Sequence, residues 1–320
     1  MPRQARIDVA DQLYHVIGRG IERGKIFLDE EDYEDFIRRL EIALKKTGGK
    51  VHAWCLMPNH FHLVIVRGRR SLAELMRRVM TGYAVGFNIK YKRAGHLFQN
   101  RYKSILCEEE EYLLELVAYI HLNPLRAGMV RNIAGLAKYK WCGHGALLGL
   151  HGVGFIEREY VLSHFGDAER IAVRRYETFV NDRRNKYKGH EYSGGGLLKS
   201  MGGIGNALSL GRSGEKEMSD ARILGSGDFV TSVLKGLEEV EAERMTEAEA
   251  KAETKRISGV SFEEISCKSR ERRVVRGRAV YCYLRKEKSK ASGTEIMKEL
   301  GISSGTVSYL THMGRDLAAK

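Results

Sequence analysis

The strongest restriction on the fold is the order of two apolar patterns between residues 12 and 123. Short segments with strand-like patterning alternate with longer segments whose apolar residues recur every three or four positions, as in amphipathic helices. The strand-like segments are 12–20, 50–57, 60–68 and 95–109, and the helical ones are 29–46, 71–91 and 110–123. Strand, helix, hairpin, helix, strand and helix in this order predict an α+β sandwich, with helices packed on a mostly antiparallel sheet.

Turn and capping residues mark the ends of these segments. Pro58 and Asn59 are turn formers, and they connect the second and third strands as a hairpin. Ser71 followed by Glu74 has the spacing of a capping box and predicts the start of the second helix. Pro124 predicts the end of the third helix, because a proline disfavours helical backbone at the residue before it.

The charge balance indicates the kind of partner. The 320 residues include 54 Lys and Arg against 41 Asp and Glu, a net charge of +13 that favours a polyanion, with nucleic acid first. We find no apolar run long enough to span a membrane and no apolar core of a secretory signal, so no membrane partner is expected. The five cysteines are scattered and form no C-x-x-C pair, which is typical of reduced thiols in the cytoplasm.

The patterns divide the chain into three regions. We expect residues 1–145 to form the α+β domain, and residues 146–220 to form an extension that ends in a flexible linker rich in Gly and Ser. Residues 221–320 are helix-like throughout, with a helix-turn-helix at about 292–314. The expected organisation is therefore two folded regions joined by a flexible connection.

His60 and His62 lie one residue apart at the start of the third strand. Because side chains alternate along a strand, both imidazoles project from one face, while Phe61 and Leu63 project from the other. Two adjacent imidazoles are a natural pair of metal ligands. Such a pair on its own is more often structural, so the metal interpretation depends on a third ligand.

The last of the three helices offers a candidate for that ligand. Its core stripe consists of Leu113, Leu116, Val117 and Ile120. Tyr119 and Asn123 lie four residues apart and hence on one helix face, which brings a phenol and a carboxamide together. The simpler interpretation is that Tyr119 is a half-buried aromatic residue and Asn123 a helix cap before Pro124.

Two motifs and the basic stretch between them resemble a known family. MPNHFHLVI (57–65) and AYIHLNPLRAGMV (118–130) together resemble the single-tyrosine HUH transposases of the insertion-sequence-200-like group, most closely the REP-associated tyrosine transposases. The resemblance covers about residues 10–145 and implies a ferredoxin-like HUH domain. It also implies that His60, His62 and Asn123 bind Mg²⁺ or Mn²⁺, and that Tyr119 is the nucleophile.

The reaction that this resemblance implies agrees with the chemistry of the groups. A tyrosine has an ordinary pKa of about 10, so its attack on phosphorus needs help in losing the proton. A metal held by two neutral nitrogens and one neutral oxygen keeps its full charge for the phosphodiester and acts as a Lewis acid. The expected product is a 5′-phosphotyrosyl link with a free 3′-hydroxyl, which can rejoin strands without ATP.

A basic block between residues 67 and 103 holds ten Lys or Arg against one acid. We expect the block to follow DNA phosphates, and Tyr91, Phe98 and Tyr102 to stack on unpaired bases. A solvated basic helix with core aromatics is the alternative. With the strand-end residue Arg19, the candidate DNA-binding residues are Arg19, Arg67, Arg69, Arg70, Arg77, Arg78, Lys92, Arg93, Arg101 and Lys103.

The C-terminal region carries a second DNA signal. Two helices around Gly301 fit the pattern, and their buried positions are Ile296, Leu300, Val307 and Leu310. Ser304 and Thr306 would face DNA. Residues 255–317 resemble the helix-turn-helix domain of the bacterial replication initiator without its basic base-reading signature, which implies duplex DNA as a further partner. A three-helix bundle with no nucleic-acid role is the alternative.

We therefore expect a cytoplasmic DNA transposase or strand transferase that nicks and rejoins single-stranded DNA near hairpins, as a monomer or a homodimer. Two alternatives stay open. One is a DNA-binding regulator whose HUH site is inactive. The other is a zinc-stabilised domain that uses His60 and His62 with Cys55 or Cys107.

Overall fold

The computed structural model of the protein describes residues 6–185, 220–242 and 244–318, in two units, Met1–Thr231 and Ser232–Lys320. In the described part of the first unit, five strands form one sheet in the order β2-β3-β1-β4-β5. The strands are β1 (Leu13–Arg19), β2 (Lys50–Met57), β3 (His60–Val66), β4 (Lys103–Cys107) and β5 (Ile223–Leu224). The helices between them are α1 (Glu30–Thr47) and α2 (Leu72–Lys90).

The strand order confirms the expected ferredoxin-like α+β fold. The first four strands and two helices follow the order βαββαβ, and every pair among β1 to β4 is antiparallel. The short strand β5 pairs in parallel with β4 at the sheet edge. Sequence patterns do not predict β5, because two residues are too few to show a period.

The capping residues explain where α1 and α2 begin. Asp29 and Asp32 form a reciprocal capping box at the start of α1. At the start of α2, Ser71 accepts a hydrogen bond from the backbone N–H of Glu74, as predicted. The reciprocal bond expected from the Glu74 carboxylate is replaced by an ion pair with Arg78, because that guanidinium lies one turn further along the helix.

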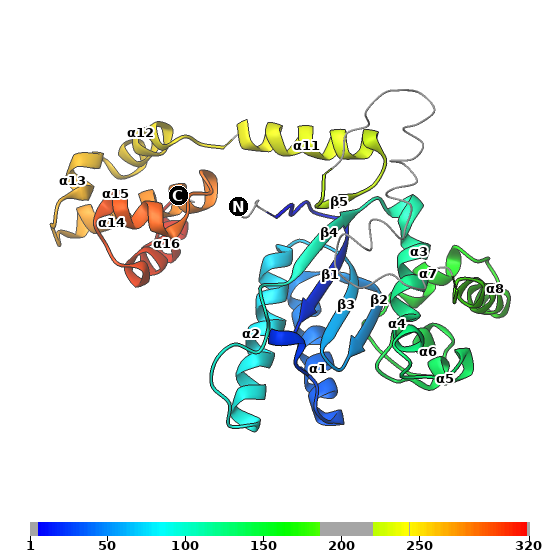
Figure 1. Ribbon diagram of the computed structural model, residues 1–320. Helices are drawn as coiled ribbons and strands as arrows, with labels where there is room; N and C mark the ends of the chain where they lie inside the picture. Colours follow the sequence, from blue (N-terminus) through cyan, green and yellow to red (C-terminus); the bar gives the residue numbers. More distant parts are fainter. Residues whose placement is uncertain (1–5, 186–219, 243, 319–320) are drawn as a thin grey trace. The chain divides into compact units, whose positions relative to one another are not determined.

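The two faces of the sheet have different partners (Figure 1), with α1 and α2 on one face and α3 (Glu109–His121) on the other. Phe61 packs against Phe36 of α1, with ring centroids 4.9 Å apart. Gly18 lies opposite Phe61, and a side chain there would collide with the ring. His62 faces the other way, toward Tyr119 of α3. The predicted alternation of Phe61 and the histidines is therefore confirmed.

The end of α3 differs from our expectation. The helix ends at His121, and α4 (Asn123–Arg126) begins after a single residue, with Pro124 in its first turn. Proline is tolerated there because the N–H groups of the first turn have no partner within the helix. Pro124 therefore opens a new helical turn where we predicted only an end.

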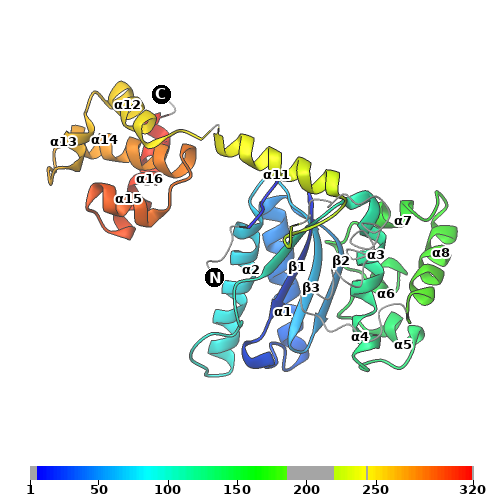
Figure 2. The ribbon, with the colours of Figure 1, turned by 45° about the horizontal axis from the view of Figure 1, so that its top comes forward.

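The extension belongs to the first unit and packs on α3. Its helices are α5 (Ile133–Lys138), α6 (Gly143–Leu147), α7 (Arg158–Ser163) and α8 (Glu169–Asp182). Val161, Phe165 and Val180 share one buried cluster with Leu113 and Leu116 of α3. Figure 2 shows these helices on the α3 side of the sheet. The boundary expected at residue 145 is therefore not seen, and most of the predicted Gly/Ser-rich linker, 186–219, lies outside the described residues.

Tyr176 of α8 joins the end of α3 to α6 through two buried hydrogen bonds. Its hydroxyl lies 2.7 Å from Nδ1 of His121 and 2.7 Å from Nδ1 of His144. Burial lowers the pKa of both imidazoles, that of His144 to about 4. One hydroxyl can donate to only one of two neutral rings, so the histidines have opposite tautomers.

Two further contacts fix α3 along its length. The Tyr160 hydroxyl donates to Glu109 Oε1 over 2.6 Å at the start of the helix. The Arg183 guanidinium donates from Nε to Glu115 Oε1 over 2.7 Å at its middle. We call Tyr160, Tyr176 and Arg183 the α3 clamp. Because the clamp contacts both ends and the middle of α3, the helix is held against its own chain.

Replacing Tyr176 with phenylalanine tests the clamp. Tyr176→Phe leaves two buried imidazole nitrogens without a partner, and we expect it to lower the free energy of unfolding by about 2–4 kcal/mol. The matched control is Tyr160→Phe, where the residue is 42% exposed and the expected loss is below about 1 kcal/mol. Urea denaturation measures both, and equal losses would contradict this role for Tyr176.

The second unit is helical in the residues that the structure describes. Its helices include α12 (Glu247–Ser258), α13 (Phe262–Ser266), α14 (Arg272–Tyr283), α15 (Gly293–Leu300) and α16 (Ser304–Ala318), and α11 (Gly227–Ala242) spans the unit boundary. Ile296, Leu300, Val307 and Leu310 are buried, as the sequence predicts. Gly301 ends α15 with φ +62°. None of the helices in the described ranges has the length and apolar content needed to cross a bilayer.

Candidate active site

The pairing of β1 with β3 gathers polar side chains on the sheet face that α3 covers. Arg19 lies opposite His60, and Ile17 lies opposite His62. Because side chains alternate along each strand, His15 and Arg19 of β1 project to the same face as both β3 histidines. Gly18 and Arg19 are therefore part of the strand that builds the site.

Tyr119 meets the histidines on this face. Its ring centroid lies 6.4 Å from that of His62 and 6.4 Å from that of His15, each in an edge-on arrangement. The rings of His60 and His62 are 5.0 Å apart and nearly perpendicular. The structure therefore places the predicted nucleophile beside the predicted metal ligands.

Neighbouring groups engage the Nδ1 atom of each histidine. Nδ1 of His60 lies 2.7 Å from Oδ1 of Asn59, which can only accept a hydrogen bond, so Nδ1 carries the proton. Nδ1 of His62 lies 2.9 Å from Nε2 of His15. If His62 donates in that bond, both histidines present the Nε2 lone pair, which is the form that binds a metal.

Burial keeps these imidazoles neutral. Desolvation, with a smaller effect from Arg19, lowers the pKa of His60 to about 4. Desolvation also holds the pKa of His62 well below its ordinary value and lowers that of His15 to about 3. All three are neutral at pH 7, and a neutral imidazole is what metal binding requires.

Asn123 is fully buried at the start of α4. Its amide nitrogen donates to the carbonyl oxygens of Ile120 and Tyr119, at 3.1 and 3.3 Å. Its Oδ1 atom has no hydrogen-bond partner among the described residues. A buried carbonyl oxygen without a partner is unusual, and a cation or a donor at this point would satisfy it.

Arg126 covers the tyrosine. Its guanidinium lies over the Tyr119 ring, 4.3 Å from the centroid, and donates a hydrogen bond to the Tyr119 carbonyl oxygen. Tyr119 is only 2% exposed to solvent. Arg126 therefore holds a positive charge directly beside the Tyr119 ring.

Three cations border the histidines. Arg19 and Arg126 each lower the pKa of His62, and Lys103 lowers that of His15. Lys103 pairs with Ile17 across β4 and β1, and so projects to the same sheet face. The sequence singled out Arg19 and Lys103, and the structure brings both to the site.

Other predicted DNA-binding residues lie elsewhere or are paired with acids. Arg67, Arg69 and Arg70 follow the end of β3 opposite to His60, about 20 Å along the strand. Arg67 pairs with Asp8 at 2.8 Å. Arg78 pairs with Glu74 at 2.9 Å, and Arg70 reaches the same carboxylate at 4.0 Å.

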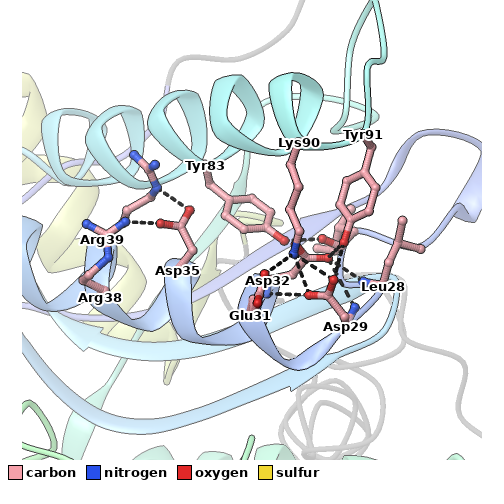
Figure 3. A network of polar contacts seen from close by, with 11 residues as sticks. Leu28, Asp29, Glu31, Asp32, Asp35, Arg38, Arg39, Tyr83, Lys90 and Tyr91 are labelled. Atoms are coloured by element: carbon pink, nitrogen blue, oxygen red, sulfur yellow. Dashed lines mark hydrogen bonds and ion pairs between the residues drawn. The ribbon is translucent and has the colours of Figure 1, made fainter.

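Part of the basic block is neutralised within the fold. Figure 3 shows Lys90, at the end of α2, directed at the acids at the start of α1. Its Nζ lies 2.7 Å from Asp29 and 3.1 Å from both Glu31 and Asp32. Tyr91 joins them through its hydroxyl, 2.8 Å from Asp29. These residues bond α2 to α1. The basic block of the folded protein therefore has less unpaired positive charge than the count of Lys and Arg in its sequence.

The remaining candidates are exposed. Arg77, Lys92, Arg93 and Arg101 have exposed side chains on α2 or in the segment after it. Arg93 lies over the Phe87 ring, 5.5 Å from the centroid. In the second unit, Ser304 and Thr306 are exposed at the start of α16, as predicted.

Sequence reasoning missed His15 and Arg126. His15 looks like a lone histidine in an apolar strand, and only the register of β1 against β3 brings it to His62. Arg126 lies seven residues after Tyr119, which is two helical turns, and this spacing was the available signal.

Within the described ranges, no group of three or more His, Cys, Asp and Glu side chains could hold a metal ion. This finding does not support the zinc interpretation, which uses His60 and His62 with Cys55 or Cys107. Cys55 lies opposite His62 in the β2–β3 pairing, but the pKa of its thiol is raised well above the ordinary value by burial. Among the described residues, no third ligand of these four types therefore accompanies His60 and His62.

The fold and these groups define a class of domain, in which two histidines on a split βαβ sheet face one tyrosine on a covering helix. Residues 8–123 match the family model described as Transposase IS200 like. The match contains Tyr119, Asn123 and both β3 histidines, so the resemblance to the insertion-sequence-200-like group that we infer from the motifs is confirmed over this range. The helix-turn-helix resemblance of the second unit stays a prediction.

The chain was also compared with curated proteins and with solved structures. None of the curated proteins matches this chain. One solved structure is described as "Structure of the REP associates tyrosine transposase bound to a REP hairpin". It is 14% identical, covers 48% of this chain and 90% of its own chain, and has a TM-score of 0.39. A TM-score below 0.5 is too low to support an argument about function.

Proposed function

We propose that the first unit is a metal-dependent DNA strand transferase that nicks and rejoins single-stranded DNA near hairpins. The observation that carries the proposal is the contact of the Tyr119 ring with His62, within the range that matches the transposase family. A phenol beside two neutral imidazoles is a set of groups suited to phosphodiester transesterification.

The residues that would hold a divalent metal are His60, His62 and Asn123. Their donors fit Mn²⁺ or Mg²⁺, because two neutral imidazole nitrogens and one amide oxygen suit these ions and leave positions open for phosphate. The unpartnered Oδ1 of Asn123 supports this donor set. When bound, the metal supplies Lewis-acid stabilisation of the scissile phosphate.

The proposed step exchanges one phosphodiester for another. The Tyr119 oxygen forms a bond to phosphorus and the bond from phosphorus to the 3′ oxygen breaks, while the phenol loses its proton and the 3′ oxygen gains one. The product is a 5′-phosphotyrosyl DNA strand and a free 3′-hydroxyl. A 3′-hydroxyl can reverse the step, so rejoining needs no ATP.

The cations bordering the site would bind the DNA backbone. Arg126 would exchange its contact with the Tyr119 ring for the scissile phosphate, which exposes the phenol as the substrate binds. Arg19 and Lys103 lie on the same sheet face and would contact adjacent phosphates. Substrate binding and exposure of the nucleophile would then be one event.

A labelled hairpin oligonucleotide with single-stranded flanks tests this proposal. After incubation with Mn²⁺ or Mg²⁺, we expect a 3′ label to migrate with the protein on a denaturing gel and a 5′ label to appear in a shorter free strand. Chelation of the metal with EDTA should abolish both products. DNA binding without an adduct under any metal would favour the inactive regulator.

His15→Leu tests how the ligands are oriented. We expect His15 to act as a positioning residue through its 2.9 Å contact with His62, so the substitution should weaken Mn²⁺ binding about 10- to 100-fold in calorimetry. His52→Leu is the matched control, because His52 is equally buried on β2 and packs on Tyr160. Equal losses in both variants would rule out a specific role for His15.

The second unit would add a second DNA contact. Its two helices around Gly301 and the exposed Ser304 and Thr306 support duplex DNA as the partner of this unit. We expect binding of duplex DNA to weaken when both residues are replaced by aspartate, whereas adduct formation on the hairpin should not change. The proposed protein acts in the cytoplasm as a monomer or a homodimer.

A further inference from the structure

The turn between β2 and β3 is bonded to the segment that follows β1. The carbonyl oxygen of Pro58 in this turn accepts a hydrogen bond from the backbone N–H of Ile26 over 2.7 Å. The carbonyl oxygen of Asn59 accepts one from the backbone N–H of Gly20 over 2.9 Å. His60, the first proposed metal ligand, comes directly after this turn. The segment that follows β1 therefore fixes the backbone from which His60 projects.

The side chain of Asn59 extends this connection to the imidazole. Its Nδ2 atom donates a hydrogen bond to the carbonyl oxygen of Arg23 over 3.0 Å. Its Oδ1 atom lies 2.7 Å from Nδ1 of His60. A backbone carbonyl can only accept, so the amide must direct its nitrogen to Arg23 and its oxygen to His60. One amide therefore joins a backbone carbonyl of the loop to a proposed ligand.

The direction of these two bonds decides the form of the His60 ring. The amide oxygen of Asn59 can only accept, so the proton of the neutral imidazole lies on Nδ1 and the lone pair on Nε2. The same bond restricts the rotation of the ring about its own side-chain axis. Metal binding needs both a lone pair and a ring held in one orientation.

The loop that supplies the carbonyl has an unusual backbone. Glu22 and Arg23 lie in the short helix η1 (Ile21–Arg23), with φ angles of 52° and 60°. This left-handed region is unfavourable for residues with a Cβ atom, and such backbone persists only where the surrounding structure holds it. The fold therefore holds the Arg23 carbonyl in a defined place opposite the Asn59 amide.

We propose that Asn59 is a positioning residue, which holds His60 in the tautomer and the ring orientation that bind the metal. The sequence predicts Asn59 only as a turn former, and in that simpler role its side chain could be removed without effect on His60. This inference rests on the metal site of the proposed strand transferase. It adds a residue that acts through a ligand without touching the metal.

Three substitutions at one position test the tautomer. Asn59→Leu keeps the size of the side chain, Asn59→Gly keeps a residue suited to a turn, and both remove the acceptor. Asn59→Asp keeps the acceptor and loses the bond to Arg23. Nitrogen NMR of the imidazoles in metal-free protein shows which nitrogen carries the proton, and His60→Ala identifies the signals. We expect Nδ1–H alone in the unchanged protein and in Asn59→Asp, and both tautomers in the other two variants.

Calorimetry with Mn²⁺ measures the consequence for binding. We expect Asn59→Leu and Asn59→Gly to raise Kd about 10- to 100-fold, and Asn59→Asp to stay within about threefold of the unchanged protein. The matched control is Asn88→Leu. The Asn88 amide also donates to a backbone carbonyl, that of Gly95, over 2.9 Å, but it lies on α2, across the sheet from the histidines. The control should leave Kd unchanged.

The outcomes separate this inference from the proposed function. His60 with Nδ1–H alone in Asn59→Leu and Asn59→Gly would overturn the positioning role, even if the unchanged protein binds Mn²⁺. Affinity losses in these variants that Asn59→Asp or Asn88→Leu equals would overturn it as well. Absence of Mn²⁺ binding by the unchanged protein would instead overturn the proposed metal site, whereas the NMR experiment needs no metal.

Discussion

Tyr119→Phe is expected to abolish the covalent DNA adduct, with a loss of cleavage rate of at least about 1,000-fold. The substitution removes only the phenolic oxygen, which is the proposed nucleophile. The ring that faces His62 and lies under Arg126 stays in place, so DNA binding and folding should be unchanged. Gel analysis of the adduct and anisotropy of the same hairpin measure the two quantities in parallel.

Tyr112→Phe is the matched control for this experiment. Tyr112 is a buried tyrosine on the same helix, seven residues earlier, and it is the nearest competing phenol along α3. We expect its cleavage rate to stay within about threefold of that of the unchanged protein. An adduct that survives Tyr119→Phe and is lost in Tyr112→Phe would reassign the nucleophile.

A mixture of Tyr119→Phe and His60→Ala proteins is expected to stay inactive. Each variant alone should lose at least about 1,000-fold in cleavage rate, and together they hold one intact tyrosine and one intact ligand set. An exchange of α3 between subunits would restore a complete site in such a mixture. The α3 clamp holds the helix against its own chain through Tyr176 and Arg183, so we expect Tyr119 to act in its own site.

The control for this experiment is unchanged protein that goes through the same unfolding and refolding. The two variants are refolded together from urea, so that any exchange of helices has had time to occur, and unchanged protein treated in the same way must regain activity. Recovery of adduct formation above about one tenth of that level would show that Tyr119 acts in a partner's site and would contradict the role of the clamp.

Much of the first unit follows from local patterns. The alternation of strand and helix between residues 12 and 123 predicts the antiparallel sheet, and the period of two places Phe61 opposite to the histidines. The nearness of Asn123 to Tyr119 follows from their spacing of four, although Asn123 belongs to α4 and its amide donates to the Tyr119 carbonyl oxygen. These features depend on residues within a few positions of one another, which is why the sequence is sufficient for them.

Features that depend on contacts across the chain could not be predicted. His15 gains its role only from the register of β1 against β3. The pairing of Lys90 with the start of α1 joins residues about sixty positions apart and removes a cation from the predicted block. The sequence places the extension outside the domain because clear patterning thins after Lys140, and only its shared core with α3 shows that its helices belong to the first unit.

The late position of β5 has a consequence for synthesis on the ribosome. β4 ends at Cys107, but the strand that covers its edge begins at Ile223, more than a hundred residues later. At typical rates of translation the β4 edge stays open for roughly 6 to 23 s after it emerges. An open strand edge can pair with other chains, so nascent copies on one messenger are most exposed to aggregation during this interval.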